Sequence, residues 1–289
     1  MTNEKKPLSG IISDIQRFST EDGPGIRTTV FFKGCNLRCQ WCHNPETQHF
    51  QPEIMFYERK CTHCGACEKV CPNALKTCDV CGKCADVCPN GAREISGKTW
   101  DVETLINEIK KDELFYQTSL GGVTFSGGEC MLQIDFLEEV LKRCKQAGIS
   151  TAVDTAGEVP FAYFERILPY VDLFLYDIKS MNSQTHERYV GVKNERILDN
   201  LRQLQTKNAR IWVRIPIIEE VNATQEEMQA INTFLKTGGG VEKVELLPYH
   251  KFGEHKYKAL SRDVKSFSTP SQETLQMLAS VFDIPASVR

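Results

Sequence analysis

Long hydrophobic runs, strong net charge and low-complexity tracts are all missing from this sequence. Its longest apolar runs fall far short of the about 20 residues that a membrane-spanning helix needs, and its first residues, MTNEKKPLSG, lack the apolar stretch of a signal peptide. The formal net charge is only −3, so no global positive field favours nucleic acid or an anionic membrane surface. We therefore expect a cytoplasmic protein that binds neither nucleic acids nor membranes.

The overall composition is that of an ordinary globular protein. Of the 289 residues, 41% are hydrophobic and 25% are charged, which argues against disorder. A chain of this length forms one or two domains with a sizeable hydrophobic core.

Cysteine is the residue type that the chain has in excess, with 13 copies. The count is odd and a cytosol is reducing, so a disulfide framework is not expected. Eight cysteines lie between Cys61 and Cys88 and three more lie within residues 35–42, whereas Cys130 and Cys144 stand apart. We expect these last two to pack as small apolar side chains. The clustering of the other cysteines predicts thiolate ligands for metal.

Six largely apolar runs of the chain predict β-strands buried on both faces. They cover residues 27–33, 122–125, 149–154, 172–178, 211–218 and 243–249. Helical patterns cover residues 101–116, 132–147, 160–168, 183–206, 224–236 and 271–281. This alternation predicts an α/β fold with right-handed crossovers, as either a partial (β/α) barrel or an open doubly wound sheet.

About fifty residues interrupt this alternation between the first strand and its crossover helix. They predict a small inserted domain over 51–98, held by metal rather than by a core of its own. The main domain then consists of residues 1–50 and 99–289.

The insert contains the run C-x2-C-x2-C-x3-C twice, each time followed by proline, as in bacterial ferredoxins. In that pattern the fourth cysteine of each run ligates the cluster of the other run. One [4Fe–4S] cluster is therefore expected on Cys61, Cys64, Cys67 and Cys88, and another on Cys71, Cys78, Cys81 and Cys84. Two structural zinc sites are the minority alternative. Such clusters either relay electrons or only hold the insert together, and the sequence leaves both roles open.

A third group of cysteines follows the first strand with the spacing C-x3-C-x2-C, at Cys35, Cys39 and Cys42. Three thiolates leave one iron of a [4Fe–4S] cluster without a protein ligand, and an open coordination position is typical of catalytic metal centres. A zinc site completed by His43 or His49 is the alternative on spacing alone.

These motifs, with Trp41 directly before the third cysteine, resemble the signature of radical S-adenosylmethionine (SAM) enzymes. The resemblance continues in order along nearly the whole chain through DGPGIR at 22–27, SGGE at 126–129, DTAG at 154–157, DIK at 177–179, WVR at 212–214 and LPYH at 247–250. Together they resemble the activating enzymes of glycyl-radical enzymes, the group that includes pyruvate formate-lyase activase. The insert is similar to that of the activases of glycyl-radical eliminases and decarboxylases.

The resemblance implies a partial (β/α)6 barrel of radical SAM type with an inserted ferredoxin-like domain. It also implies roles for residues near the carboxyl ends of the strands, where the active sites of such folds gather. Catalysis would depend on the open cluster of Cys35, Cys39 and Cys42. The residues implied to contact SAM are Trp41, Cys42, His43, Gly127, Gly128, Glu129, Asp177, Lys179, Arg214 and His250. Asp154, Thr155 and Asp177 would hold a monovalent cation, and Asp22, Gly23 and Gly25 would lie near the partner's glycine.

The implied activity is reductive cleavage of SAM to a 5′-deoxyadenosyl radical, which abstracts a Cα hydrogen from a glycine of a partner enzyme. The partner is expected to be a glycyl-radical eliminase, dehydratase or decarboxylase, and the electron donor a flavodoxin or ferredoxin. Three [4Fe–4S] clusters and a monomeric state are expected as well. The alternatives are a radical SAM enzyme that acts on a small molecule, a non-catalytic ferredoxin-type electron carrier and a zinc-stabilised scaffold.

Overall fold

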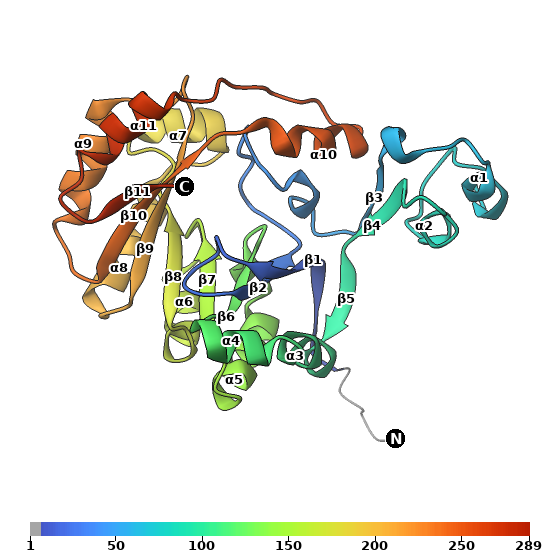
Figure 1. Cartoon of the computed structure of the whole chain (residues 1–289), viewed down its shortest axis with the longest axis horizontal. Helices are drawn as coiled ribbons and strands as arrows, with labels where there is room; N and C mark the ends of the chain where they lie inside the picture. Colours follow the sequence, from blue (N-terminus) through green and yellow to red (C-terminus); the bar gives the residue numbers. More distant parts are fainter. Residues whose placement is uncertain (1–6) are drawn as a thin grey trace.

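The computed structural model of the chain describes residues 7–289. Its main feature is a nine-stranded sheet with the order β11-β10-β9-β8-β7-β6-β2-β1-β5. Neighbouring strands from β2 to β11 are parallel, whereas β1 is antiparallel to both β2 and β5. The expected α/β fold is confirmed, and the sheet is mixed because an antiparallel pair extends one edge (Figure 1).

All six strands expected from the sequence are present. They are β2 (Arg27–Phe32), β6 (Gly122–Gly127), β7 (Ser150–Thr155), β8 (Leu173–Asp177), β9 (Ile211–Ile217) and β10 (Val241–Pro248). Three further strands of this sheet were not expected: β1 (Ser9–Ser19), β5 (Lys98–Asp101) and β11 (Ala286–Val288). β1 escapes the sequence pattern because its second half exposes Gln16, Arg17 and Phe18, so it lacks the continuous apolar run of a buried strand.

Alternating residues of these strands face two different environments. Outward-facing residues such as Phe125, Phe174 and Val213 pack with the surrounding helices in the main hydrophobic core. The inner face begins with a small apolar cluster of Ala152, Leu173, Leu175 and Trp212 near the amino ends of the strands. Two residues further along three of these strands, the same face carries Asp154, Asp177 and Arg214. The inner face therefore changes from apolar to charged toward the carboxyl ends of the strands.

The helices of the main domain follow the expected pattern, except that a short helix over Glu254–Ala259 was not expected and two expected helices are each divided in two. They are α3 (Val102–Lys110), α4 (Glu113–Ser119), α5 (Ile134–Gln146), α6 (Phe161–Ile167), α7 (Ser183–Val190), α8 (Glu195–Thr206), α9 (Gln225–Leu235), α10 (Glu254–Ala259) and α11 (Gln272–Ala279). The helix expected over 101–116 is divided into α3 and α4 at Asp112, whose buried carboxylate binds Arg17 and Thr28 on β1 and β2. The helix expected over 183–206 is divided into α7 and α8 by Gly191, which has a φ of +91°.

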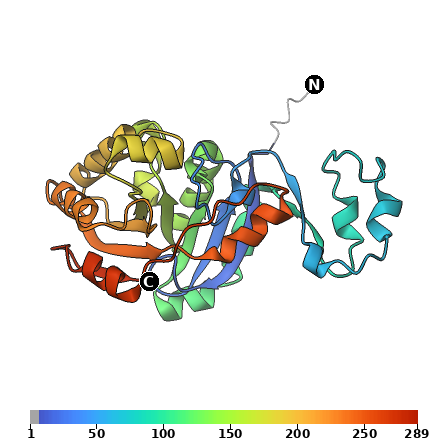
Figure 2. The ribbon, with the colours of Figure 1, turned by 90° about the horizontal axis from the view of Figure 1, so that it is seen from above.

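The segment expected as an insert lies beyond the β1 and β5 edge, on one side of the main sheet in both views (Figures 1 and 2). It begins with β3 (Glu53–Phe56) and returns through β4 (Arg93–Ser96), and these two strands form a separate antiparallel sheet. Between them lie two short helices, α1 (Ala66–Val70) and α2 (Lys83–Asp86). No helix within residues 7–289 is long and apolar enough to cross a membrane.

Candidate active site and cysteine cavities

A cavity of about 280 Å³ opens at the carboxyl ends of the parallel strands. Most of the residues that the sequence predicts for the active site line it. These are Cys35, Cys39, Trp41, Cys42, His43, Gly127, Gly128, Asp154, Thr155, Asp177, Lys179 and His250. The structure therefore brings together side chains from the loop after β2 and from β6, β7, β8 and β10, which lie far apart in the sequence.

The three cysteines reach this cavity from the loop that follows β2. Burial raises the pKa of the Cys39 thiol to about 12 and also raises the pKa of the Cys35 and Cys42 thiols. The backbone N–H of Leu37 donates to Cys35 Sγ at 3.4 Å. Thiols this deeply buried would become thiolates only with a compensating metal charge. The chemistry of these donors therefore fits a thiolate-bound metal cluster.

Lys179 and Asp177 form a buried ion pair on the wall of the cavity, with Nζ 2.5 Å from Oδ2. Burial lowers the pKa of Lys179, but the Asp177 carboxylate and the Cys39 thiol outweigh it, so the net pKa is raised. The lysine is therefore a fixed cation that can bind a carboxylate.

Asp154 lies on the same wall, where its Oδ2 accepts a hydrogen bond from Ser126 Oγ at 2.7 Å and lies 3.6 Å from the Arg214 guanidinium. Burial raises the pKa of Asp154 to about 6, although Arg214 opposes the shift. Thr155 donates its hydroxyl to Glu129 at 2.8 Å. Within residues 7–289, no three Asp, Glu, His or Cys side chains converge closely enough to hold a single metal ion. Asp154, Thr155 and Asp177 all line the cavity, and their role as ligands of a monovalent cation stays a prediction.

Glu129 and Arg214, which the sequence assigns to the cofactor, lie behind the cavity instead of lining it. Glu129 is 1% exposed, and its carboxylate accepts hydrogen bonds from Thr155 Oγ1 and from the backbone N–H of Ala156. Burial raises its pKa to about 7. Its side chain turns inward and joins the SGGE turn to the end of β7, so its observed contacts are structural.

Arg214 lies on β9 directly opposite Asp177 of β8, among three acidic side chains. Its guanidinium is 3.2 Å from Glu245, 3.6 Å from Asp154 and 3.7 Å from Asp22. It thereby connects the wall of the cavity to the loop between β1 and β2. The observed role of Arg214 is to neutralise buried carboxylates, and Pro216, two residues further along β9, lines the cavity in its place.

The loop with the predicted partner-binding residues folds into the barrel from the other end. Asp22 accepts hydrogen bonds from Ser19 Oγ at 2.6 Å and Thr29 Oγ1 at 2.7 Å. Gly23 has a φ of +120° and Gly25 a φ of +70°. A Cβ atom on Gly25 would lie only 2.5 Å from the Ser119 carbonyl oxygen, so the tight turn requires glycine.

The glycines of the SGGE turn allow two backbones to approach each other. A Cβ atom on Gly127 would lie 2.3 Å from the Phe32 nitrogen, and one on Gly128 would lie 2.1 Å from the Gly34 carbonyl oxygen. The turn therefore packs directly against the start of the cysteine loop. Sequence reasoning predicted glycines for close approach to a ligand, and the structure adds this second, internal reason.

Several residues that line the cavity were not predicted from the sequence. They are Leu37, Asn44, Ser126, Ala156, Pro216, Ile218, Leu247, Pro248 and Tyr249. Five of them, Ser126, Ala156, Leu247, Pro248 and Tyr249, lie within the quoted motifs SGGE, DTAG and LPYH, so membership of a motif is the signal that could have found them. Trp41 packs against Tyr189 and Phe267, with ring centroids 6.4 and 6.1 Å away. His43 and His250 lie edge to face at 4.6 Å.

The eight cysteines of the insert line two neighbouring cavities in the two sets that their spacing predicts. Cys61, Cys64, Cys67 and Cys88 line a cavity of about 230 Å³. Cys71, Cys78, Cys81 and Cys84 line another of about 460 Å³. All thirteen cysteines of the chain are free thiols.

Backbone N–H groups point at the sulfur atoms of the insert. His63 donates to Cys61 Sγ at 3.4 Å, and Leu75 and Ala92 donate to Cys71 Sγ and Cys88 Sγ at 3.2 Å each. Hydrogen bonds to sulfur are a feature of iron–sulfur sites and tune their potentials. The donor sets of both cavities therefore fit four-thiolate clusters.

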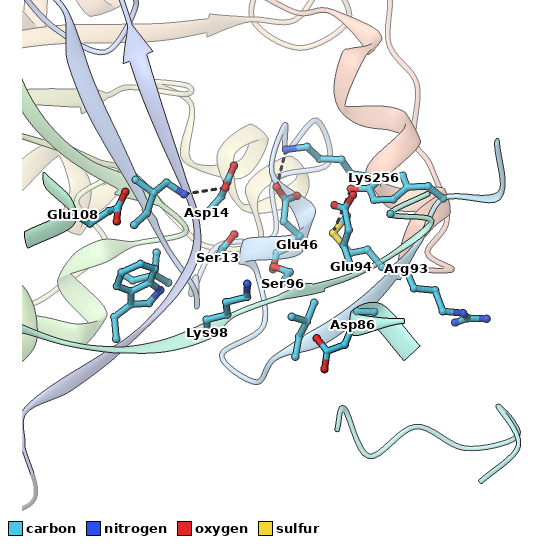
Figure 3. A pocket seen from close by; sticks show the side chains of 18 residues that line it. Ser13, Asp14, Glu46, Asp86, Arg93, Glu94, Ser96, Lys98, Glu108 and Lys256 are labelled. Atoms are coloured by element: carbon cyan, nitrogen blue, oxygen red, sulfur yellow. Dashed lines mark hydrogen bonds and ion pairs between the residues drawn. The ribbon is translucent and has the colours of Figure 1, made fainter. Parts of the chain in front are cut away.

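A larger cavity of about 710 Å³ lies between β1, β5 and the insert, and no predicted site residue lines it. Its labelled residues carry both signs of charge, among them Asp14, Glu94, Lys98 and Lys256 (Figure 3). Size therefore does not identify the active site here, because this cleft lacks the cysteines and the converging strand ends.

Charged contacts fasten the insert to the cysteine loop of the barrel. The fully buried Lys33 donates to the Glu46 carbonyl at 2.5 Å and to Glu53 at 3.0 Å. Arg262 contacts Glu53 at 2.5 Å from the other side. Lys256 contacts Glu46 at 2.6 Å at the wall of the large cleft (Figure 3). The first strand of the insert is thus held directly against the loop that carries Cys35, Cys39 and Cys42.

Comparison with known proteins is consistent with this geometry. Residues 29–231 match the Radical SAM superfamily. The trans-4-hydroxy-L-proline dehydratase activating enzyme of Clostridioides difficile is 42% identical, over 96% of this chain and 97% of that protein. The choline trimethylamine-lyase activating enzyme of Oleidesulfovibrio alaskensis is 37% identical, over 99% and 98% of the two chains. A domain of the pyruvate-formate lyase-activating enzyme from Bacteroides vulgatus has a TM-score of 0.51 and 34% identity, covering 58% of this chain and 99% of that domain.

Proposed function

The chain belongs to the radical SAM superfamily and, within it, to the activating enzymes of glycyl-radical enzymes, and we propose that it generates the glycyl radical of a partner eliminase, dehydratase or decarboxylase. One observation carries this proposal. Cys35, Cys39 and Cys42 line a single cavity with the glycine turn and Lys179, in a chain that aligns over nearly its full length with such activating enzymes.

Residues of the barrel cavity would bind the open [4Fe–4S] cluster and SAM. The bound cluster would supply the electron for reductive cleavage of SAM, the chemistry that would place a radical on the partner's glycine. Lys179 offers a positive charge to the methionyl carboxylate, and the partly exposed backbone of Gly127 and Gly128 lies close to the cysteine loop. Trp41 and His43 supply the flat surfaces that suit adenine. The apolar wall of Ile218 and Leu247 keeps water away from the radical.

We further propose that the insert holds two [4Fe–4S] clusters, one in each cysteine cavity, and that they relay electrons. The four-cysteine lining of each cavity and its N–H···S hydrogen bonds support this, as does the charged contact between Glu53 and Lys33. We expect a flavodoxin or ferredoxin as donor, a monomeric activase and a monovalent cation near Asp154 and Asp177 in the loaded enzyme.

The test of the activity is anaerobic. The reconstituted protein, with dithionite and SAM, is incubated with a panel of glycyl-radical enzymes that includes a hydroxyproline dehydratase and a choline trimethylamine-lyase. We expect 5′-deoxyadenosine by chromatography and a glycyl doublet by electron paramagnetic resonance (EPR) on at least one partner. Absence of both products, from protein with full iron content, would overturn the proposal. Turnover of a small molecule without any protein partner would favour the runner-up class.

Iron content tests the number of clusters separately. Three [4Fe–4S] clusters correspond to about 12 iron atoms per chain, and the barrel cluster alone to about 4. Stoichiometric zinc in the insert would contradict the two-cluster proposal without touching the activity of the barrel.

A further inference from the structure

Three side chains line both cysteine cavities of the insert, and they define the wall that the cavities share. They are Phe56, Leu75 and Arg93, and only Arg93 is charged. Phe56 and Arg93 lie directly opposite each other where β3 pairs with β4. The Arg93 guanidinium lies 4.5 Å from the centre of the Phe56 ring, within the range of a cation–π interaction. The shared wall is thus a stacked pair of a cation and an aromatic ring.

The positive charge of Arg93 has no protein counterpart in the part of the chain that the structure describes. Its Nε is buried without a hydrogen-bond partner. The adjacent Glu94 pairs with Lys60 instead, at 2.7 Å. Arg93 also extends away from the other labelled residues of the large cleft (Figure 3). Arg93 is half-buried, and its buried Nε is the part of the guanidinium that lacks a hydrogen-bond partner, so an anionic acceptor next to it would be favourable.

Arg93 lies beside thiols of both sets. Cys84 lines one cavity and Cys88 lines the other, and Arg93 lines both. One side chain is therefore placed to act electrostatically on both sets of thiols.

We propose that Arg93 is a positioning residue for electron transfer that raises the reduction potentials of both insert clusters from the wall between them. A cluster held by four thiolates becomes more negative when it is reduced, so a nearby positive charge stabilises the reduced form more than the oxidised form. A cation between both clusters shifts their potentials in the same direction. This inference rests on the proposed two-cluster insert.

The test uses the full chain with Cys35→Ala, Cys39→Ala and Cys42→Ala, so that only the insert clusters contribute to the EPR spectrum. In this background, Arg93→Gln should disfavour reduction of each insert cluster at least tenfold. That change lowers each midpoint potential by about 59 mV for a one-electron couple. Arg93→Lys keeps the charge and should restore most of that shift. Phe56→Leu removes the ring that holds the guanidinium and should lower both potentials by less, even if Arg93→Gln fails to assemble clusters.

Lys60→Gln is the matched control. Lys60 is also a cation of the insert, but it lines only one cavity, its side chain is 47% exposed and Glu94 neutralises it. Loss of the Lys60 charge should leave the potential of the cluster at Cys71, Cys78, Cys81 and Cys84 unchanged. It should shift the potential of the cluster in the cavity that Lys60 lines by less than a twofold change in the reduction equilibrium.

Two outcomes overturn the inference, and they differ from each other. Wild-type iron content that corresponds to the barrel cluster alone would remove the two-cluster proposal and this inference with it. Intact insert clusters whose potentials in Arg93→Gln and Phe56→Leu match those of Lys60→Gln would overturn the role of Arg93 alone.

Discussion

The barrel cavity and the two insert cavities are all built from cysteines, but they differ in what accompanies the sulfur. Each insert cavity has four cysteines, a complete ligand set for a cubane cluster. The barrel cavity has three, and the remaining wall consists of Lys179, two carboxylates and the glycine turn. Polar groups in place of a fourth thiolate fit the proposed binding of SAM at an open position of the cluster.

The most exposed thiols lie in the insert. Cys64, Cys78 and Cys81 are exposed there, although Cys84 is buried, whereas none of the three barrel cysteines is exposed. An exposed cluster can accept an electron from a donor protein, and a recessed cluster can keep a radical away from water. This difference supports the proposal that electrons enter at the insert and that the radical forms in the barrel.

The largest expected effect comes from removing one barrel thiolate. Cys39→Ser should abolish SAM cleavage with any reductant, because two remaining cysteines cannot hold the open cluster. Production of 5′-deoxyadenosine measures this, and the iron of the insert should remain. Cys144→Ala is the matched control, since Cys144 is fully buried but lines none of these cavities, and it should keep full activity. Substantial 5′-deoxyadenosine from Cys39→Ser would contradict the division between the regions.

Removing the insert clusters should strongly reduce SAM cleavage with a protein electron donor but not with dithionite. The double variant Cys64→Ser and Cys81→Ser takes one ligand from each set, so about two thirds of the iron should be lost. Dithionite can still reduce the barrel cluster directly, so SAM cleavage with dithionite should persist. Cleavage driven by flavodoxin or ferredoxin should fall at least tenfold. Equal rates with both reductants would show that the insert clusters are structural only.

Much of this comparison could be predicted from the sequence because it depends on local spacing. The positions of Cys61 to Cys88 alone predicted which four thiols share each cavity, and the buried apolar runs predicted the six central strands. The glycine turns and the cysteine loop were also predictable, because each is formed by residues that are neighbours in the sequence. Residues at the ends of parallel strands meet at one edge, so most cavity residues were predictable as well.

What the sequence could not predict depends on how side chains turn and on contacts between distant segments. Glu129 follows the glycine turn, but its carboxylate points inward to Thr155. Arg214 is level with Asp177 on the neighbouring strand, but its guanidinium turns to Asp22 and Glu245, which neutralise it. The contacts of Lys33 with Glu53 and of Phe56 with Arg93 link strands whose pairing no periodicity reveals.

A smaller effect is expected from Lys179, the one lysine that lines the barrel cavity. Lys179→Met should weaken SAM binding because the carboxylate of SAM loses a charge-assisted hydrogen bond, worth about 1.5–3 kcal/mol or roughly 10- to 100-fold in Kd. Equilibrium binding of SAM to the reconstituted protein measures it. Lys236→Met removes an exposed lysine of another ion pair and should bind SAM normally. Unchanged SAM affinity in Lys179→Met would place the carboxylate elsewhere.

The smallest effect concerns Glu129, which supports the barrel cavity from behind and has no counterpart in the insert cavities. Burial raises its folded-state pKa to about 7 from an ordinary value of 4.5. Between these values the folded protein holds a proton that the unfolded chain has released, so stability should fall as the pH rises from 4.5 to 7. The full change from this group is at most about 3 kcal/mol.

Glu129→Gln removes this titration, so the variant should lose less stability than the wild type across that pH window. The free energy of unfolding is measured by anaerobic denaturant unfolding of the reconstituted proteins at about pH 5 and about pH 7.5. Most of the titration of Glu129 falls between these two pH values. Glu103→Gln, on the exposed surface of α3, is the control and should keep the wild-type pH dependence. Because the amide oxygen introduced by Glu129→Gln can still accept from Thr155, the variant should retain the cavity and its clusters at the lower pH. An identical pH dependence in Glu129→Gln and the wild type would show that the carboxylate is ionised throughout, held by its N–H and O–H donors against the cost of burial.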